Sequence, residues 1–105
     1  MESNLFTALI QKLSKDFALE SNQLPVQTDM EAIRQHLTER IREMMVRNYE
    51  RFLNSMYRID VSETKVSQIL RSKDKLSIPG QLADLIIERQ LQRIKTQMLY
   101  KEGKL

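Results

Sequence analysis

The sequence contains no cysteine and no tryptophan, and its 105 residues include only two glycines, two prolines and one histidine. Without cysteine, neither a disulfide nor a thiolate metal site can form. The shortage of glycine and proline leaves little of the turn chemistry that β-sheets need, and therefore favours an all-α fold. A chain free of cysteine is compatible with a reducing compartment, so we expect a cytoplasmic protein.

Long apolar runs are also missing. No uncharged apolar stretch approaches the roughly 18 residues that a transmembrane helix requires. The first twenty residues place charged side chains inside an apolar stripe and lack the basic start and unbroken apolar run of a secretion signal. We therefore expect a soluble protein without membrane contact, folded as one domain over residues 1–105.

The rest of the chain is organised around residues 29–58. Apolar residues recur there at steps of three or four, and Asn48 is the one polar member of this stripe. The mean step of about 3.6 residues fits a straight helix in a bundle better than a coiled coil. We expect one long helix, capped by Thr28 or Asp29, with Asn48 in the core. A buried asparagine that specifies a dimer is the alternative.

Amphipathic patterns on both sides of this stretch predict further helices, giving a small four-helix bundle. The predicted helices cover residues 4–20, 29–58, 61–71 and 79–100, and residues 101–105 are expected to form a frayed tail. Asp60 has capping-box spacing for the third helix, with Ser62 as the alternative cap, and Pro79 suits the first turn of the fourth. We expect Arg58 and Asp60 to fix the junction between the second and third helices.

The net charge of +3 is distributed unevenly, since residues 1–39 carry three basic and six acidic side chains and residues 65–105 carry nine and four. Four arginines follow one line on the predicted long helix, within about 20° of one another at 100° per residue. They are Arg40, Arg47, Arg51 and Arg58.

Two interpretations of this arginine stripe remain open. In the first, Glu43 pairs with Arg47 at i,i+4 spacing and acids of neighbouring helices neutralise the remainder. The candidate acids are Asp16, Glu20, Asp84 and Glu88. In the second, the stripe binds an acidic protein partner or a phosphate backbone, because guanidinium groups recognise oxyanions well.

Nucleic-acid binding through the basic long helix and the C-terminal half is the alternative function. The second basic group consists of Lys65, Arg71, Lys73, Lys75, Arg89, Arg93, Lys95, Lys101 and Lys104. Tyr100 is the only aromatic residue there that could stack on a base. The connection from Ser72 to Pro79 is too long for the three- or four-residue turn of a helix-turn-helix pair.

The apolar band over residues 80–100 is wider than one contact requires, which indicates a core on one side and a second subunit on the other. We therefore expect self-association, most simply as a homodimer. The candidate oligomer interface consists of Leu82, Leu85, Ile86, Leu91, Ile94 and Met98.

The sequence offers no constellation for catalysis. His36 is the only histidine, and its nearest helical carboxylate, Glu39, reverses the order of the glutamate and histidine in di-iron bundles. We expect His36 to be a surface residue, and we expect no catalytic, cofactor-binding or metal-binding residues, no cofactor and no small-molecule substrate. The expected function is that of a non-enzymatic helical interaction or regulatory protein.

Overall fold

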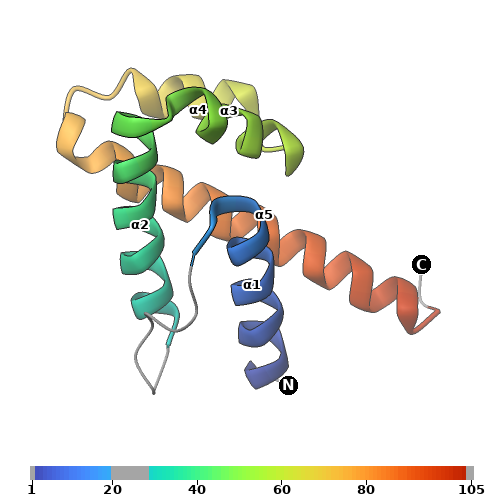
Figure 1. Ribbon diagram of the computed structural model, residues 1–105. Coiled ribbons are helices and arrows are strands. Elements are labelled where there is room, and N and C mark those ends of the chain that lie inside the picture. The colour runs from blue at the N-terminus through green and yellow to red at the C-terminus, as the bar shows by residue number, and fades with distance from the viewer. Residues whose placement is uncertain (1, 20–28, 104–105) are drawn as a thin grey trace.

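The computed structural model describes residues 2–19 and 29–103, and the regular elements within them are helices. Five α-helices and one short 3₁₀ helix follow one another along the chain (Figure 1). They are α1 (Glu2–Phe17), α2 (Met30–Arg47), α3 (Tyr49–Arg58), α4 (Glu63–Leu70), the 3₁₀ helix η2 (Lys75–Ser77) and α5 (Ile78–Lys101). The predicted all-α fold is confirmed in this part of the chain.

Asn48 interrupts the helix that was predicted over residues 29–58, so the predicted continuity is wrong. The backbone of Asn48 leaves the helical region (φ −154°, ψ 65°), although its N–H still donates to the carbonyl oxygen of Met44 at 2.7 Å. Its side-chain oxygen accepts a hydrogen bond from the backbone N–H of Arg51 at 3.3 Å. Asparagine favours this position because its short side chain bonds backbone groups that a helix end leaves unpaired. Asn48 therefore ends α2 and caps α3, and it is exposed rather than buried in the core.

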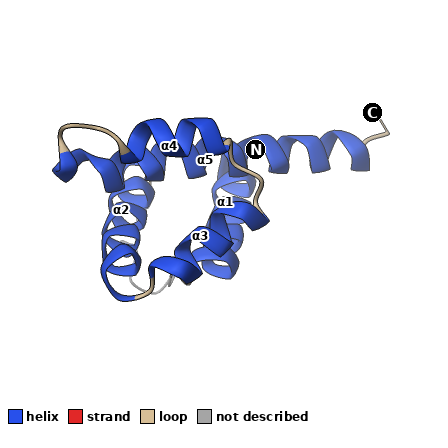
Figure 2. Cartoon of the chain, turned by 90° about the horizontal axis from the view of Figure 1, so that it is seen from above, coloured by secondary structure: helices blue, strands red, loops and turns tan. Residues whose placement is uncertain are grey.

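Helix α5 holds the other helices together. Both α1 and α2 pack against it, α2 most extensively, while α3 and α4 close one end of the molecule (Figures 1 and 2). The fully buried apolar side chains include Leu9, Leu13, Phe17, Ile33, Leu37, Ile41, Phe52, Met56, Leu82 and Ile86. The rings of Phe17 in α1 and Phe52 in α3 lie with their centroids 6.3 Å apart. One continuous core thus joins α1, α2, α3 and α5, whereas α4 contributes no fully buried residue.

The helix starts follow the sequence signals with one correction. Asp29 caps α2 by accepting from the backbone N–H of Ala32 at 2.8 Å, as predicted. Asp60 does not cap α4, because it lies in the preceding turn with a left-handed backbone (φ 60°). The alternative cap is correct, since the hydroxyl of Ser62 accepts from the backbone N–H of Lys65 at 3.3 Å. Pro79 lies in the first turn of α5, as predicted.

Helix α1 ends at Phe17 because Ala18 takes a positive φ of 55°. The N–H groups of Ala18 and Leu19 then turn back to the carbonyl oxygens of Ser14 and Leu13, at 3.1 and 3.4 Å. Glu20, with which the predicted helix ends, lies outside the described residues, as do the last two residues of the predicted tail. None of the described helices has the length and apolar character needed to cross a bilayer.

Candidate interaction surfaces

The break at Asn48 divides the predicted arginine stripe between two helices. Arg40 and Arg47 belong to α2, whereas Arg51 and Arg58 belong to α3. The prediction of one arginine line along one helix is therefore wrong, and the four side chains must be considered separately.

The guanidinium group of Arg40 is bound by other groups of the fold. Its Nε donates to the carbonyl oxygen of Phe17 at 2.9 Å, and its Nη1 lies 3.5 Å from the carboxylate of Glu43. The carbonyl of Phe17 is at the C-terminal end of α1, where the helix itself provides no donor. Arg40 therefore joins α1 to α2 and is not available to a partner.

The other three arginines are accessible. Arg47 is 79% exposed and its Nη1 lies 3.8 Å from Glu43, the i,i+4 pair that was predicted, but an exposed pair of this length contributes little stability. Arg51 and Arg58 are exposed, and their side chains form no ion pair or hydrogen bond with the described residues. These two guanidinium groups are the part of the predicted stripe that a partner could bind.

Two of the acids predicted to neutralise the stripe, Asp16 and Asp84, have other partners, and a third, Glu88, is exposed and forms no ion pair with the described residues. Asp84 binds Arg34, with Nε and Nη2 of the arginine 2.6 and 3.2 Å from the two carboxylate oxygens. The hydrogen bond from Arg34 to Asp84, together with the negative charge of Asp84, raises the pKa of Arg34 above its ordinary value. Asp16 lies 3.7 Å from Arg93. Glu20 is outside the described residues, so no described acid other than Glu43 pairs with the stripe.

A buried polar contact that was not predicted from the sequence joins α1 and α5. Gln90 is 0% exposed, and its amide nitrogen donates to the carboxylate of Asp16 at 2.7 Å while its amide oxygen accepts from Arg93 at 2.9 Å. Arg93 was grouped with the basic residues that could bind nucleic acid, but here it closes an internal network. The available signal was a glutamine inside the apolar band of residues 80–100.

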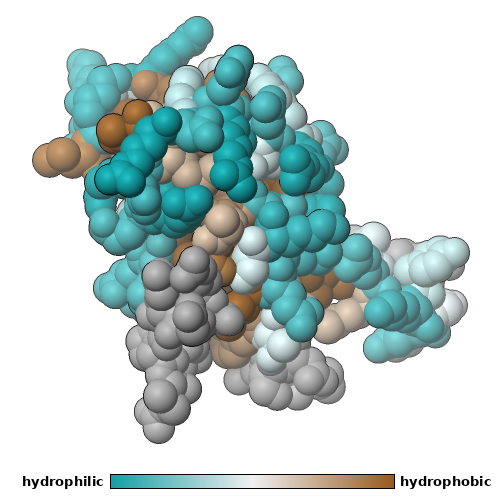
Figure 3. Space-filling view, in the orientation of Figure 1, coloured by the Kyte–Doolittle hydropathy of each residue, from teal (hydrophilic) through white to brown (hydrophobic). Residues whose placement is uncertain are grey.

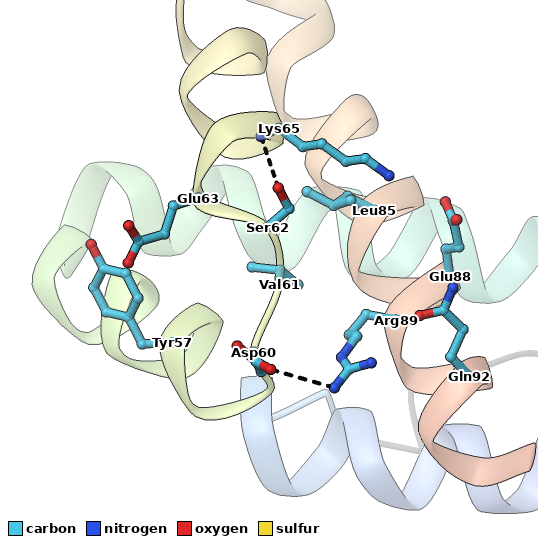
Figure 4. A pocket seen from close by; sticks show the side chains of 10 residues that line it. All are labelled: Tyr57, Asp60, Val61, Ser62, Glu63, Lys65, Leu85, Glu88, Arg89 and Gln92. Atoms are coloured by element: carbon cyan, nitrogen blue, oxygen red, sulfur yellow. Dashed lines mark hydrogen bonds and ion pairs between the residues drawn. The ribbon is translucent and has the colours of Figure 1, made fainter. Parts of the chain in front are cut away.

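A cavity of about 410 Å³ opens between the α3–α4 turn and α5 (Figure 4). Arg89 lies in it and is engaged, because its Nε donates to the carbonyl oxygen of Ile59 at 2.9 Å and its Nη2 lies 3.7 Å from Asp60. The predicted lock between Arg58 and Asp60 is therefore wrong, since Arg89 takes the place of Arg58. Carboxylates and cations both line the cavity, so it offers no strong attraction for ions of either sign.

The described residues do not form a cluster that could bind a metal ion, since they contain no suitable group of three histidine or carboxylate side chains. His36 is half-buried on α2.

The residues of the predicted oligomer interface divide into three groups. Leu82, Ile86 and Ile94 are buried in the core and cannot contact a second subunit while the fold is intact. Leu85 and Leu91 are half-buried, and Met98 is 37% exposed. An interface on α5 is therefore restricted to Leu85, Leu91, Met98 and their neighbours.

Large apolar side chains collect at the C-terminal end of α5, which projects beyond the other helices (Figures 1 and 2). Beyond Met98, Leu99 is 40% exposed and Tyr100 is 75% exposed. Ile94 is the last buried residue of the helix. The face shown in Figure 3 is mostly hydrophilic where α3 and α4 lie. Large apolar side chains are also exposed singly at the end of α2, on α3 and in η2, namely Val46, Tyr49, Tyr57 and Leu76.

Comparisons with protein-family models, curated proteins and solved structures found no match to this chain. Two surfaces of the described residues are therefore the candidates for contact with a partner, the exposed C-terminal end of α5 and the unpaired arginines of α3.

Proposed function

We propose that the protein is a non-enzymatic interaction protein that self-associates through the C-terminal end of α5. The observation that carries this proposal is the uncovered continuation of α5 from Lys95 to Lys101, beyond its last buried residue Ile94. The unpaired guanidinium groups of Arg51 and Arg58 would serve a second, anionic partner.

An uncovered helix end is costly to maintain. Short helical segments are marginal in water, because most of the stability of a helix in a protein comes from packing one face against another element. Residues 95–101 continue α5 for roughly 10 Å at 1.5 Å per residue, and all of them are exposed. A second helix packed against this segment would supply the missing contact.

The side chains on this end of α5 are suited to such a contact. Leu91 and Met98 are seven residues apart, so they lie on nearly the same face of the helix, and Leu99 borders that face. Methionine and tyrosine are enriched at protein interfaces, where they provide large contact areas. Met98, Leu99 and Tyr100 together form the surface that we call the α5 end.

Sedimentation velocity over a range of protein concentrations tests the proposal. We expect the sedimentation coefficient to rise with concentration towards that of a dimer. A coefficient that stays at the monomer value over the whole range would overturn the proposal.

A further inference from the structure

The connection between α3 and α4 has the length found in helix-turn-helix pairs. α3 ends at Arg58 and α4 begins at Glu63, so four residues join the two helices. Two helices linked by a turn of three or four residues form the supersecondary unit that many DNA-binding proteins use. The connection between the third and fourth helices predicted from the sequence, by contrast, is too long for such a unit.

The turn is held rigidly. The N–H groups of Asp60 and Val61 donate to the carbonyl oxygens of Tyr57 and Met56, at 3.1 and 3.4 Å. Asp60 takes the left-handed conformation, which aspartate tolerates better than most residues. Ile59 and Val61 are buried on either side of it, and Arg89 of α5 binds the carbonyl oxygen of Ile59. These contacts fix α4 relative to the body of the molecule.

Helix α4 presents a polar face to the solvent. Its apolar residues Val66, Ile69 and Leu70 are half-buried against the core, and the helix has no fully buried residue. Thr64 and Gln68 are exposed one turn apart, and Arg71 follows at the end of the helix on the same face. Hydroxyl, amide and guanidinium groups are the side-chain donors and acceptors that read base edges in the major groove.

Cations without partners surround this face. Lys65, Arg71 and Lys73 are exposed and their side chains form no ion pair or hydrogen bond with the described residues, like Arg51 and Arg58 on α3. The acids on the same elements are fewer. They are Glu50, Asp60, Glu63 and Asp74, of which Asp60 already pairs with Arg89. Asp84 and Glu88 of the neighbouring α5 lie beside Lys65 and Gln68, and Asp84 is bound to Arg34. The surface formed by α3, the turn, α4 and the following loop is therefore positively charged overall.

We propose that α3 and α4 bind double-stranded DNA, with α4 in the major groove. Gln68 and Arg71 contact base edges, while Arg51, Arg58 and Lys73 bind phosphates on either side. This inference rests on the part of the proposed function that assigns the free arginines to an anionic partner, and it identifies that partner.

The structure favours duplex DNA over the other anionic partners. The major groove of B-form DNA is about 12 Å wide and admits an α-helix, whereas the major groove of duplex RNA is too narrow for side chains to read. An acidic protein would be expected to meet an apolar patch at the centre of its binding surface. The exposed side chains of α4, the helix that would contact the partner, are polar or charged, whereas the exposed residues Tyr49 and Tyr57 lie on α3 and Leu76 lies in η2.

Fluorescence anisotropy titration of the full chain with a labelled pool of random 20-base-pair duplexes tests the inference. We expect binding at about 50 mM salt that weakens steeply as salt rises, with a log–log slope near −0.9 for each phosphate contact. Arg51→Ala should reduce the slope by about one and weaken binding several-fold on every sequence. Lys15→Ala removes an exposed cation on α1, outside both proposed surfaces, and is the matched control, for which we expect no change.

Selection of bound duplexes from the random pool tests the role of α4. We expect one preferred sequence for the native chain, and loss of preference at one position in Gln68→Ala with most of the non-specific affinity retained. Far-ultraviolet circular dichroism of each variant shows that the helices remain folded.

Three results would overturn the inference. They are absence of duplex binding at low salt, equal binding to duplex RNA or to a poly-glutamate peptide, and equal loss of affinity in Arg51→Ala and Lys15→Ala. Binding to poly-glutamate without binding to DNA would support an anionic partner but would exclude DNA as that partner. Self-association through the α5 end is decided separately by sedimentation, so the two proposals can fail independently.

Discussion

The amide nitrogen of Gln90 donates a hydrogen bond of 2.7 Å to the carboxylate of Asp16, a residue 74 positions earlier in the chain. Gln90 is completely buried, and Arg93 binds both members of the pair. This network gives the α1–α5 contact a directional component that apolar packing alone does not provide. It also provides hydrogen-bond partners for Gln90, the one strongly polar side chain that is buried on α5.

Replacing Gln90 with alanine should destabilise the fold by about 2–4 kcal/mol. The change leaves a cavity and removes a donor from a carboxylate whose side chain is only 7% exposed. Urea unfolding measures the loss, with Gln92→Ala on the exposed side of α5 expected to change stability by less than about 0.5 kcal/mol. Gln90→Met keeps most of the volume and isolates the hydrogen bond. Equal stability of Gln90→Met and the native chain would show that the bond contributes nothing.

Replacing Asn48 with alanine distinguishes the observed break from a continuous helix by the sign of the effect. Because Asn48 caps α3, its replacement by alanine should lower the free energy of unfolding by about 1 kcal/mol. In a continuous helix the same substitution would stabilise the chain, because alanine has the higher helix propensity. Asn48→Gly should cost only a few tenths of a kcal/mol. Thermal unfolding followed by circular dichroism gives the order of stability of the native chain and the two variants. A rise in stability for Asn48→Ala would contradict a helix break capped by Asn48.

The left-handed backbone of Asp60 predicts an order of stability among substitutions in the turn. Glycine adopts a φ of 60° without strain, whereas alanine pays about 1–2 kcal/mol. We expect Asp60→Gly to be at least as stable as the native chain and Asp60→Ala to be less stable. The ion pair that both variants lose is long and exposed, so it contributes little to the difference. Chemical denaturation checks the order, and equal stability of the two variants would show that the strain is absent.

A negative charge at the α5 end should weaken self-association. Leu99→Asp buries a carboxylate in the proposed contact, and we expect at least a tenfold weaker dimer, or about 1.4 kcal/mol. Thr96→Asp adds the same charge to an exposed position in the same part of α5 and should have a smaller effect. Ile86→Asp is unsuitable for this test, because Ile86 is buried in the core and the variant should unfold. Equal sedimentation of Leu99→Asp and the native chain would place the contact elsewhere.

Periodicity predicted the parts of the fold that depend on local sequence. Ile33, Leu37 and Ile41 face the core as the spacing requires, and Asp29 caps the helix that contains them. The break at Asn48 was missed because Met44 and Phe52, on either side of it, still follow the helical spacing. Apolar periodicity records which side of the chain is buried, and two helices that share one core can continue the same stripe.

The surfaces were less predictable, because their state depends on contacts between distant residues. Nothing in the local sequence shows that Arg40 binds the carbonyl oxygen of Phe17, 23 residues earlier. Ile94 and Met98 occupy similar places in the same apolar band, yet one is buried and the other is 37% exposed, because the C-terminal end of α5 projects beyond the neighbouring helices. The turn between α3 and α4 contains an aspartate where a glycine would have marked the left-handed position.

Asn48 serves as the end of α2 and the start of α3, so the two helices are joined without a spacer. One extra residue at this joint would rotate α3 by about 100° about its axis and carry Phe52 and Met56 away from the core. The direction of α4 is set in turn by α3 through the rigid turn. The orientation of α4 therefore depends, through α3, on how α2 packs against α5.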